Sequence, residues 1–228
     1  MNAPGEDVRA MIQKIDVDTV VFDFDGTLAR LNINFTEMRN SVMRLITSYG
    51  APAQDFAHLF ALEMIDAGRR WISLHGTDGN DFFEKACRLI RDIELAGARK
   101  GELVPGVREM LSSLKARGIK TAVVTRNCRD ALVVLFPDID SHVGAVVTRE
   151  STPKVKPQPD HLLIALGKIS ADPRRAAMVG DHPMDIEVGK KLGMFTVGVL
   201  TGYYQRAGLE EAGADLVIES AALINDYL

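Results

Sequence analysis

The second half of the chain alternates between short runs of β-branched and other apolar residues and longer segments whose apolar residues recur every three or four positions. Such alternation, from about residue 104 onward, is typical of strands followed by helices. One earlier apolar run predicts a further strand. This pattern favours a parallel α/β sheet with helices on both faces, joined by right-handed crossovers. The predicted strands cover 18–24, 119–125, 143–148, 176–181, 194–200 and 214–218, and the predicted helices cover 106–117, 129–136, 159–168, 185–192, 205–212 and the C-terminus.

Residues 30–100 show helical spacing alone, which predicts an all-helical unit inserted into the α/β core. The core would then comprise 1–29 and 101–228, and a short helix or loose arm is expected at about 6–15. The three apolar series of the insert are Phe35, Met38, Val42, Leu45 and Tyr49, then Phe56, Phe60, Met64, Ala67 and Trp71, then Phe82, Ala86, Leu89 and Ile93.

Composition narrows the function classes. At 228 residues, with 46% hydrophobic and 25% charged residues, the chain has room for one large domain, or for one domain and an insert. A net charge of -4 shows no excess of basic residues that would favour binding to nucleic acid or to acidic membranes. No apolar stretch approaches the ~18 residues of a membrane span, so we expect a cytoplasmic protein. Cys87 and Cys128 form no metal-spaced cluster and indicate buried, reduced thiols.

Two carboxylates stand where the first predicted strand ends. Asp23 and Asp25 are separated by one residue, which puts both side chains on the same side of an extended backbone. Gly26 permits a tight turn after them, and Thr27 with the following amides would complete the hydrogen bonding of that turn. A buried parallel strand delivers such residues to the rim of a sheet, so we interpret this rim as the candidate active site.

Further polar residues follow later strands and would reach the same rim. Cleavage of a phosphate ester requires a positioned oxyanion, a cation that neutralises charge, and an acid for the leaving group. Several acids gathered on one rim would repel each other unless a lysine and a divalent cation compensated them. The residues are Thr125, Arg126 and Asn127 after strand 119–125, Lys156 in the segment before helix 159–168, and Asp181 and Asp185 after strand 176–181.

Four segments in this order resemble the motifs of the haloacid dehalogenase superfamily, and in particular its phosphoglycolate-phosphatase-like members. They are Asp-x-Asp-Gly-Thr-Leu at 23–28, the strand ending in Thr125, Lys-Pro-x-Pro-Asp at 156–160 and Gly-Asp-x-x-x-Asp at 180–185. The resemblance covers residues 18–219. It implies a Rossmannoid core, and it implies that 30–100 is a C1-type cap that closes over the site and chooses substrates.

The resemblance also implies catalytic roles. Asp23 would be the nucleophile that forms an aspartyl-phosphate, and Asp25 would protonate the leaving oxygen and then activate water. Thr125 would bind an oxygen of the transferring phosphoryl group. Lys156 would offset the repulsion between Asp23 and the phosphate.

The implied cofactor is Mg²⁺, which prefers oxygen ligands. The side chains of Asp23 and Asp181 would bind it together with the backbone carbonyl of Asp25. Asp185 would support a metal-bound water or Lys156. His182 could suggest a metal ligand or a base, but a loop role is favoured because no second histidine stands at a useful spacing.

Two features of the sequence bear on how a substrate would be recognised. The family often has Asn directly after the threonine of its second motif, whereas this chain has Arg126 and then Asn127. We hypothesise that one of these two side chains contacts the substrate beyond its phosphate. In the cap, residues 68–76 are a candidate specificity loop, but the favoured interpretation is that Trp71 and Leu74 pack and the arginines are solvated.

The sequence therefore predicts a magnesium-dependent phosphomonoester phosphatase that acts on a small phosphorylated metabolite. A phosphomutase with the same aspartyl-phosphate is the first alternative. A haloacid dehalogenase is less favoured because Asp25 and Thr27 supply the phosphatase-type acid and loop. A non-catalytic binding module is less favoured because the chain retains the full set of Asp23, Asp25, Thr125, Lys156 and Asp181.

Overall fold

The computed structural model describes residues 17–152 and 154–228, so the short helix expected at about 6–15 lies outside the described residues. The chain forms two compact units. The first comprises the chain up to Leu31 together with Gly101–Leu228, and the second comprises Asn32–Lys100. That the second unit serves as a cap remains a prediction.

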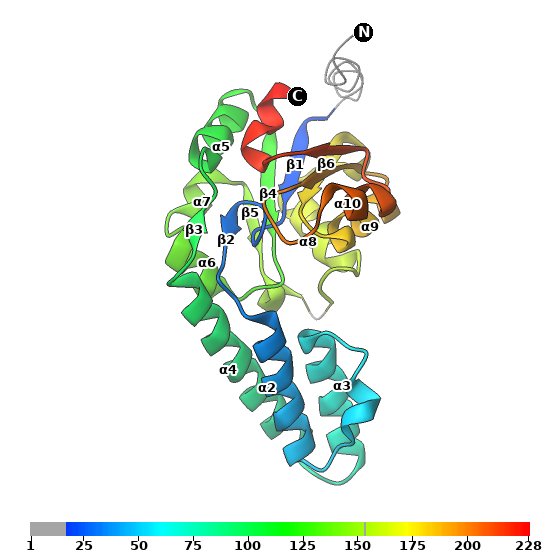
Figure 1. Cartoon of the computed structure of the whole chain (residues 1–228). Helices are drawn as coiled ribbons and strands as arrows, with labels where there is room; N and C mark the ends of the chain where they lie inside the picture. The colour runs from blue at the N-terminus through cyan, green and yellow to red at the C-terminus, as the bar shows by residue number, and fades with distance from the viewer. Residues whose placement is uncertain (1–16, 153) are drawn as a thin grey trace. The chain divides into compact units, whose positions relative to one another are not determined.

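A six-stranded sheet lies at the centre of the first unit (Figure 1). Its strands are β1 (Thr19–Phe22), β4 (Lys120–Val124), β5 (Ala145–Val147), β6 (Ala176–Gly180), β7 (Phe195–Val199) and β8 (Leu216–Ile218). All its pairings are parallel, and the order β5-β4-β1-β6-β7-β8 places β1 between β4 and β6. Most of these residues are buried, as in a parallel sheet that is covered on both faces. The predicted fold class is confirmed.

Helices flank this sheet (Figure 1). They are α5 (Val107–Ala116), α6 (Arg129–Leu135), α7 (Ile139–His142), α8 (Asp160–Lys168), α9 (Pro183–Lys191) and α10 (Arg206–Glu211), with the 3-10 helices η2 (Arg149–Ser151), η3 (Pro173–Arg175) and η4 (Ala221–Asp226). Leu162 and Leu166 of α8 and Val188 of α9 form one core cluster with Val21 and Met178 of the sheet. α5 contacts β4 and η4, while α10 contacts β7 and β8.

A short ribbon stands where the chain leaves and re-enters the first unit. β2 (Ala29–Arg30) pairs antiparallel with β3 (Glu102–Leu103). In the turn before it, Gly26 has a φ of 83°, and its amide donates to the carbonyl of Ala29 over 2.7 Å. The hydrophobic pattern did not indicate this ribbon, because a two-residue strand has no periodicity.

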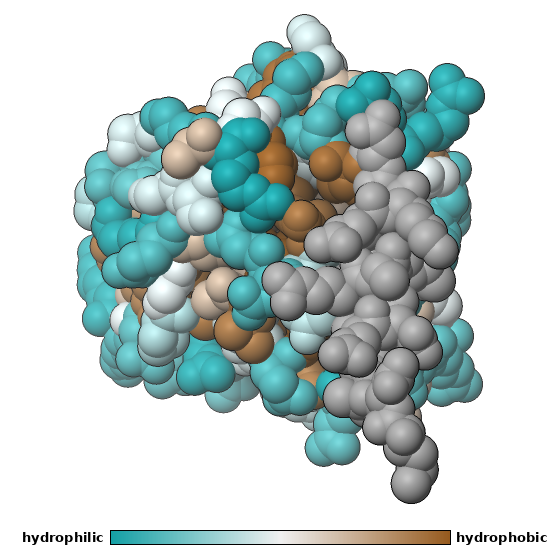
Figure 2. Space-filling view, turned by 90° about the horizontal axis from the view of Figure 1, so that it is seen from above, coloured by the Kyte–Doolittle hydropathy of each residue, from teal (hydrophilic) through white to brown (hydrophobic). Residues whose placement is uncertain are grey.

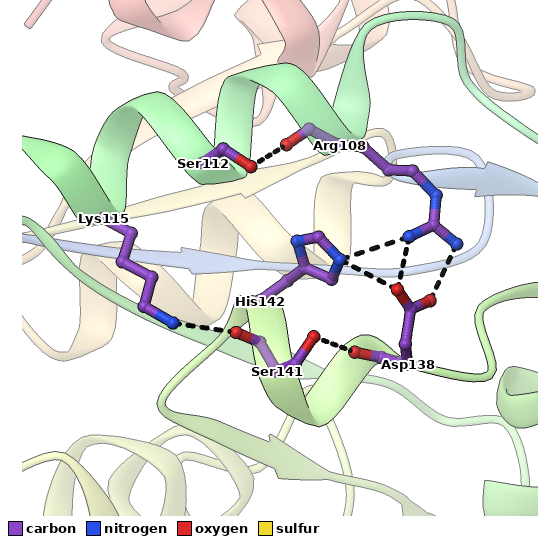
Figure 3. Close-up of polar contacts among 6 residues, drawn as sticks. All are labelled: Arg108, Ser112, Lys115, Asp138, Ser141 and His142. Atoms are coloured by element: carbon purple, nitrogen blue, oxygen red, sulfur yellow. Dashed lines mark hydrogen bonds and ion pairs between the residues drawn. The ribbon is translucent and has the colours of Figure 1, made fainter.

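A polar cluster joins α5 to α7 and the residues beside it (Figure 3). Arg108 donates two hydrogen bonds to Asp138, of 2.7 and 2.8 Å. Its guanidinium lies 4.4 Å from the centre of the Phe136 ring. The Nε2 atom of His142 lies 3.1 Å from both Arg108 and Asp138. This cluster fixes the helix that precedes β4 against the segment that precedes β5.

The second unit contains α2 (Phe35–Ser48), the 3-10 helix η1 (Ala53–Phe56), α3 (Ala61–Leu74) and α4 (Gly79–Ala98). The side chains of Asn34 and Asp78 cap the first turns of α2 and α4. Residues of all three helices form one core, among them Val42, Ile46, Met64, Ile72, Phe82 and Ile90.

Two predicted details of the second unit are wrong. Phe35 and Phe60 were placed in the apolar series of the insert, but they are 59% and 58% exposed. Residues 68–76 were considered as a loop because of their glycines, yet most of them lie in α3. Gly68 belongs in that helix because a Cβ there would come within 3.0 Å of the Phe82 ring.

Among the helices of the described residues, none has the length and apolar character that crossing a membrane requires. Apolar side chains gather in the core clusters of the two units. On the face seen from above in Figure 2, hydrophilic residues predominate and hydrophobic residues show in small patches between them.

Candidate active site

Three residues predicted for the site directly follow neighbouring strands. Asp23 follows β1, Thr125 follows β4 and Asp181 follows β6. The backbone amide of Asp23 donates to the carbonyl of Val179 over 2.9 Å, which continues the pairing of β1 with β6. Because the carboxyl ends of parallel strands meet at one edge, the three residues share that edge of the sheet. All three are buried.

Lys156 reaches this edge from the segment between η2 and α8. Its Nζ atom donates to Asp23 Oδ1 and to Asp185 Oδ1, each over 2.6 Å. The lysine side chain is 3% exposed. Burial acts to lower the pKa of Lys156, but Asp185 and Asp23 raise it above its ordinary value. The amine therefore stays charged and is shared between two carboxylates.

The first turn of α9 fixes Asp185. Its Oδ2 atom accepts a hydrogen bond from the amide of His182 over 3.3 Å. In return, His182 Nδ1 accepts from the amide of Met184 over 3.0 Å. This reciprocal arrangement caps the helix, and it gives His182 the loop role that the sequence favoured.

Three carboxylates meet beside Lys156. Each of Asp23, Asp181 and Asp185 offers an oxygen within 4.8 Å of those of the other two. Burial raises the pKa of Asp181 to about 8, and the charges of Asp23 and Asp185 add to the rise. Burial likewise raises the pKa of Asp23 to about 6, although Lys156 opposes it. Lys156 alone thus leaves negative charge uncompensated.

This donor set fits a divalent cation. Mg²⁺ is bound through one or two carboxylates together with waters and substrate phosphate oxygens. Burial is the main cause of the raised pKa values of Asp23 and Asp181, and a bound divalent cation would oppose it because it favours the ionised carboxylates.

The turn after β1 orients Asp25 and leaves room for Asp181. Asp25 Oδ1 accepts a hydrogen bond from the amide of Leu31 over 2.8 Å. A Cβ atom on Gly26 would overlap the carboxylate of Asp181. The hydroxyl of Thr201 donates to the carbonyl of Gly26 over 2.5 Å. The turn is therefore tied to the loop after β7.

That loop supplies contacts that sequence reasoning missed. The amide of Tyr203 donates to Asp181 Oδ2 over 3.3 Å. A side chain at Gly202 would overlap Asp181. The available signal was a glycine just after a predicted strand of the same parallel sheet, since the end of that strand must reach the same edge.

The residues after β4 form a compact turn. Thr125 Oγ1 accepts from the amide of Asn127 over 3.1 Å, and both residues are buried. The guanidinium of Arg126 donates to the Sδ atom of Met184 over 3.1 Å. Arg126 therefore lies beside the first turn of α9.

Thr27 lies in the turn after Asp25 and is fully buried. Within the residues that the structure describes, its hydroxyl has no hydrogen-bond partner. The family resemblance also makes Thr27 a candidate phosphate-binding residue, and that contact stays a prediction.

The sequence matches the family described as haloacid dehalogenase-like hydrolase over residues 20–199. A haloacid dehalogenase-like hydrolase domain-containing protein of Arabidopsis thaliana is 31% identical over 213 residues, which cover 92% of this chain and 82% of that protein. The pyrophosphatase PpaX of Bacillus cereus is 32% identical over 209 residues, 89% of this chain and 92% of that protein. A phosphoglycolate phosphatase of Cupriavidus necator is 24% identical over 213 residues, 88% of each chain. The crystal structure of a hydrolase from Pseudomonas syringae has a TM-score of 0.68 at 22% identity and covers 91% of this chain and 96% of that one.

Proposed function

Because this chain belongs to the haloacid dehalogenase-like hydrolases, we propose that it hydrolyses a small phosphorylated metabolite through an aspartyl-phosphate on Asp23, with Mg²⁺ as cofactor. Family membership and the relatives named phosphatases support a phosphoric monoester hydrolase. The observation that carries the mechanism is the 2.6 Å contact between the buried amine of Lys156 and Asp23. It holds a carboxylate in place as a nucleophile while offsetting its charge.

The proposed reaction has two steps. A carboxylate oxygen of Asp23 attacks phosphorus, the bond from phosphorus to the ester oxygen breaks, and Asp25 gives that oxygen a proton. Asp25 then takes a proton from water as the water attacks the phosphorus of the aspartyl-phosphate, which releases phosphate and restores Asp23. The hydrogen bond from the Leu31 amide supports this role because it orients the carboxyl group of Asp25.

The side chains of Asp23 and Asp181 and the backbone carbonyl of Asp25 would hold the cation. A bound cation would neutralise charge on the phosphoryl oxygens and keep the carboxylates ionised. Asp185 suits a supporting role, since its two oxygens already accept hydrogen bonds from Lys156 and His182.

The proposed substrate contacts lie at the same edge of the sheet. Thr125 would donate a hydrogen bond from its hydroxyl to a phosphoryl oxygen. The oxygen of that hydroxyl accepts from the amide of Asn127, which leaves the hydroxyl proton available for the phosphate. Arg126 or Asn127 would contact the substrate beyond its phosphate, and the position of Arg126 beside Met184 favours the arginine.

The second unit would act as the C1-type cap that excludes water and selects the substrate. Its helix α3 carries two arginines among the exposed residues that line an open surface hollow. The lining residues are Asp66, Arg69, Arg70, Ser73 and Leu74.

The test is phosphate release from a panel of small phosphorylated metabolites, including phosphoglycolate and inorganic pyrophosphate, with Mg²⁺ or excess chelator. We expect Mg²⁺-dependent release that Asp23→Asn abolishes. Asp226→Asn makes the same chemical change at an exposed position of η4 and should leave the rate unchanged.

Other outcomes of this test would each support one of the alternative functions. Isomerisation of a sugar phosphate without free phosphate would show a phosphomutase. Halide release from a haloacid would show a dehalogenase. A folded protein that binds phosphorylated compounds without turnover would show a binding module.

A further inference from the structure

A buried histidine outside the predicted site reaches back to its lysine. His161 lies in the first turn of α8 and has no exposed surface. Its Nδ1 atom accepts a hydrogen bond from the backbone amide of Lys156 over 3.2 Å. The imidazole thus contacts the main chain of the residue whose side chain bridges Asp23 and Asp185.

The direction of this bond fixes the state of the ring. A backbone amide can only donate, so Nδ1 must be unprotonated and the proton of the neutral ring sits on Nε2. Burial lowers the pKa of His161 to about 3, and the charge of Lys156 lowers it further, while the backbone of Thr148 and Val147 acts in the opposite direction. Among the described residues, Nε2 has no hydrogen-bond partner. The bond from the Lys156 amide is therefore the hydrogen bond that satisfies Nδ1 of this buried ring.

The local chain explains why a side chain takes this place. Pro157 and Pro159 follow Lys156 and have no amide proton to donate. The amide of Gln158 donates to the carbonyl of Val155, so that bond closes a turn around Lys156. The amide of Lys156 is left inside this turn, where a buried donor needs an acceptor. His161 supplies it from the following helix.

Anchoring the main chain of Lys156 matters because its amine serves two acceptors. Nζ must lie 2.6 Å from Asp23 and 2.6 Å from Asp185 at the same time. The buried lysine side chain is held in one arrangement by these two contacts, so a main chain that is free to shift would allow Nζ to leave one acceptor for the other.

We propose that His161 is a positioning residue: its neutral imidazole holds the Lys156 backbone so that the lysine amine stays shared between Asp23 and Asp185. This inference rests on the catalytic role proposed for Lys156. His161 itself touches neither nucleophile nor substrate.

A pair of substitutions separates the acceptor from the bulk of the ring. His161→Leu fills much of the same space without an acceptor, whereas the Oδ1 atom of His161→Asn stands close to the place of Nδ1. We expect kcat to fall about 10-fold or more in His161→Leu, with KM changed about twofold at most, and to recover most of that loss in His161→Asn. Leu166→Val, in the core-facing side of the same helix, is the packing control and should keep the native kcat.

Equal defects in His161→Leu and His161→Asn, or native kcat in folded His161→Leu, would overturn the proposal. So would a comparable loss of kcat in Leu166→Val, since the effect would then belong to the packing of α8.

A second readout needs no substrate. In NMR spectra of the native chain, the ¹⁵N signal of His161 Nδ1 should be that of an unprotonated nitrogen, and the Lys156 amide should exchange slowly with solvent. Exchange at Lys156 should speed up in His161→Leu and slow again in His161→Asn. A protonated Nδ1 or unchanged exchange would overturn the proposal. If the native chain releases no phosphate while these spectra behave as expected, the proposed function fails and the positioning role of His161 stands.

Discussion

Lys156 and Asp185 form an ion pair of 2.6 Å in which neither side chain is more than 3% exposed. The same amine pairs with Asp23 at 2.6 Å, and that carboxylate is 11% exposed. Of its two acceptors, Asp185 is thus the more deeply buried one. Both carboxylates depend on this cation for compensation.

Substitution of Lys156 by Met keeps the length of the side chain but leaves both acids without the cation. Breaking a buried pair by removing one partner costs about 3–5 kcal/mol, so we expect the free energy of unfolding at pH 7 without metal to fall by about that amount. Phosphate release should fall at least about 100-fold. Urea denaturation and steady-state kinetics measure the two effects. Asp185→Asn leaves the contact between Lys156 and Asp23, so its losses of stability and of activity should both be smaller than those of Lys156→Met. A larger loss in Asp185→Asn would contradict the shared arrangement.

The raised pKa of Asp181 predicts how stability changes with pH. Folding raises this pKa from 3.8 to about 8, so between these values the folded state binds a proton that the unfolded state has released. Stability without metal should therefore fall as the pH rises toward 8, by up to about 1.4 kcal/mol per pH unit from this residue.

The clearest window is pH 6.5–8, because the pKa of Asp23 lies near 6 and burial keeps His161 neutral there. Denaturation curves at several pH values in chelator give the slope. Asp181→Asn should flatten it, and Mg²⁺ should flatten it in the native chain because a cation favours the ionised carboxylate. A slope that Asp181→Asn leaves unchanged would refute the assignment.

Two glycines with left-handed backbones allow a matched test of the turn after Asp25. Gly26 has a φ of 83° and Gly118 has a φ of 72°. Alanine at either position adds backbone strain of about 1–2 kcal/mol. At Gly118 nothing lies within 4 Å of the added Cβ, whereas at Gly26 the added Cβ overlaps the carboxylate of Asp181.

We therefore expect Gly118→Ala to lower the melting temperature and keep the activity per folded molecule, while Gly26→Ala loses both. Calorimetry and phosphate release measure the pair. Activity retained in Gly26→Ala would show that Asp181 can move without consequence for the reaction.

The contact between Arg108 and Asp138 predicts a small effect with a characteristic pH dependence (Figure 3). Hydrogen bonds from Arg108, and to a lesser degree His142, lower the pKa of Asp138 below its ordinary value of 3.8. The stabilisation is thus present above 3.8 and is lost as the pH falls toward the folded-state pKa. Asp138→Asn should lower the melting temperature at pH 7, and the difference from the native chain should shrink below pH 3.8. Glu211→Gln, an exposed acid at the end of α10, is the control and should show no such trend.

Sequence reasoning located the strand-end residues because parallel topology decides where strand ends meet. Asp23, Thr125 and Asp181 each stand one residue beyond a strand, although the predicted strands included Thr125 and Asp181 and ran past Asp23. An error of one or two residues at a strand end does not matter here, because these residues stay at the same edge of the sheet. Lys156 was found through the resemblance of residues 156–160 to the family's Lys-Pro-x-Pro-Asp motif.

Contacts that depend on the path of a loop were beyond prediction. The amide of Tyr203 carries no side-chain signal, and its bond to Asp181 requires the position of the loop after β7. His161 looked like one residue of a helical pattern, since nothing in the sequence shows that its ring turns back toward Lys156. Gly68 was taken as a sign of a loop, whereas close packing against Phe82 requires it inside a helix.

The β2–β3 ribbon lets the insertion vary without disturbing the sheet. Pairing of Ala29 with Leu103 and of Arg30 with Glu102 brings together the two points where the chain departs and returns. The insertion between β2 and β3 is then a closed loop, and the entropic cost of closing such a loop grows only slowly with its length. Helices of this insertion can be exchanged, lengthened or removed while β1 and β4 keep their register. Under the roles proposed for the sheet edge and for the second unit, this ribbon would make chemistry and the selection of substrates separable properties, able to change one at a time.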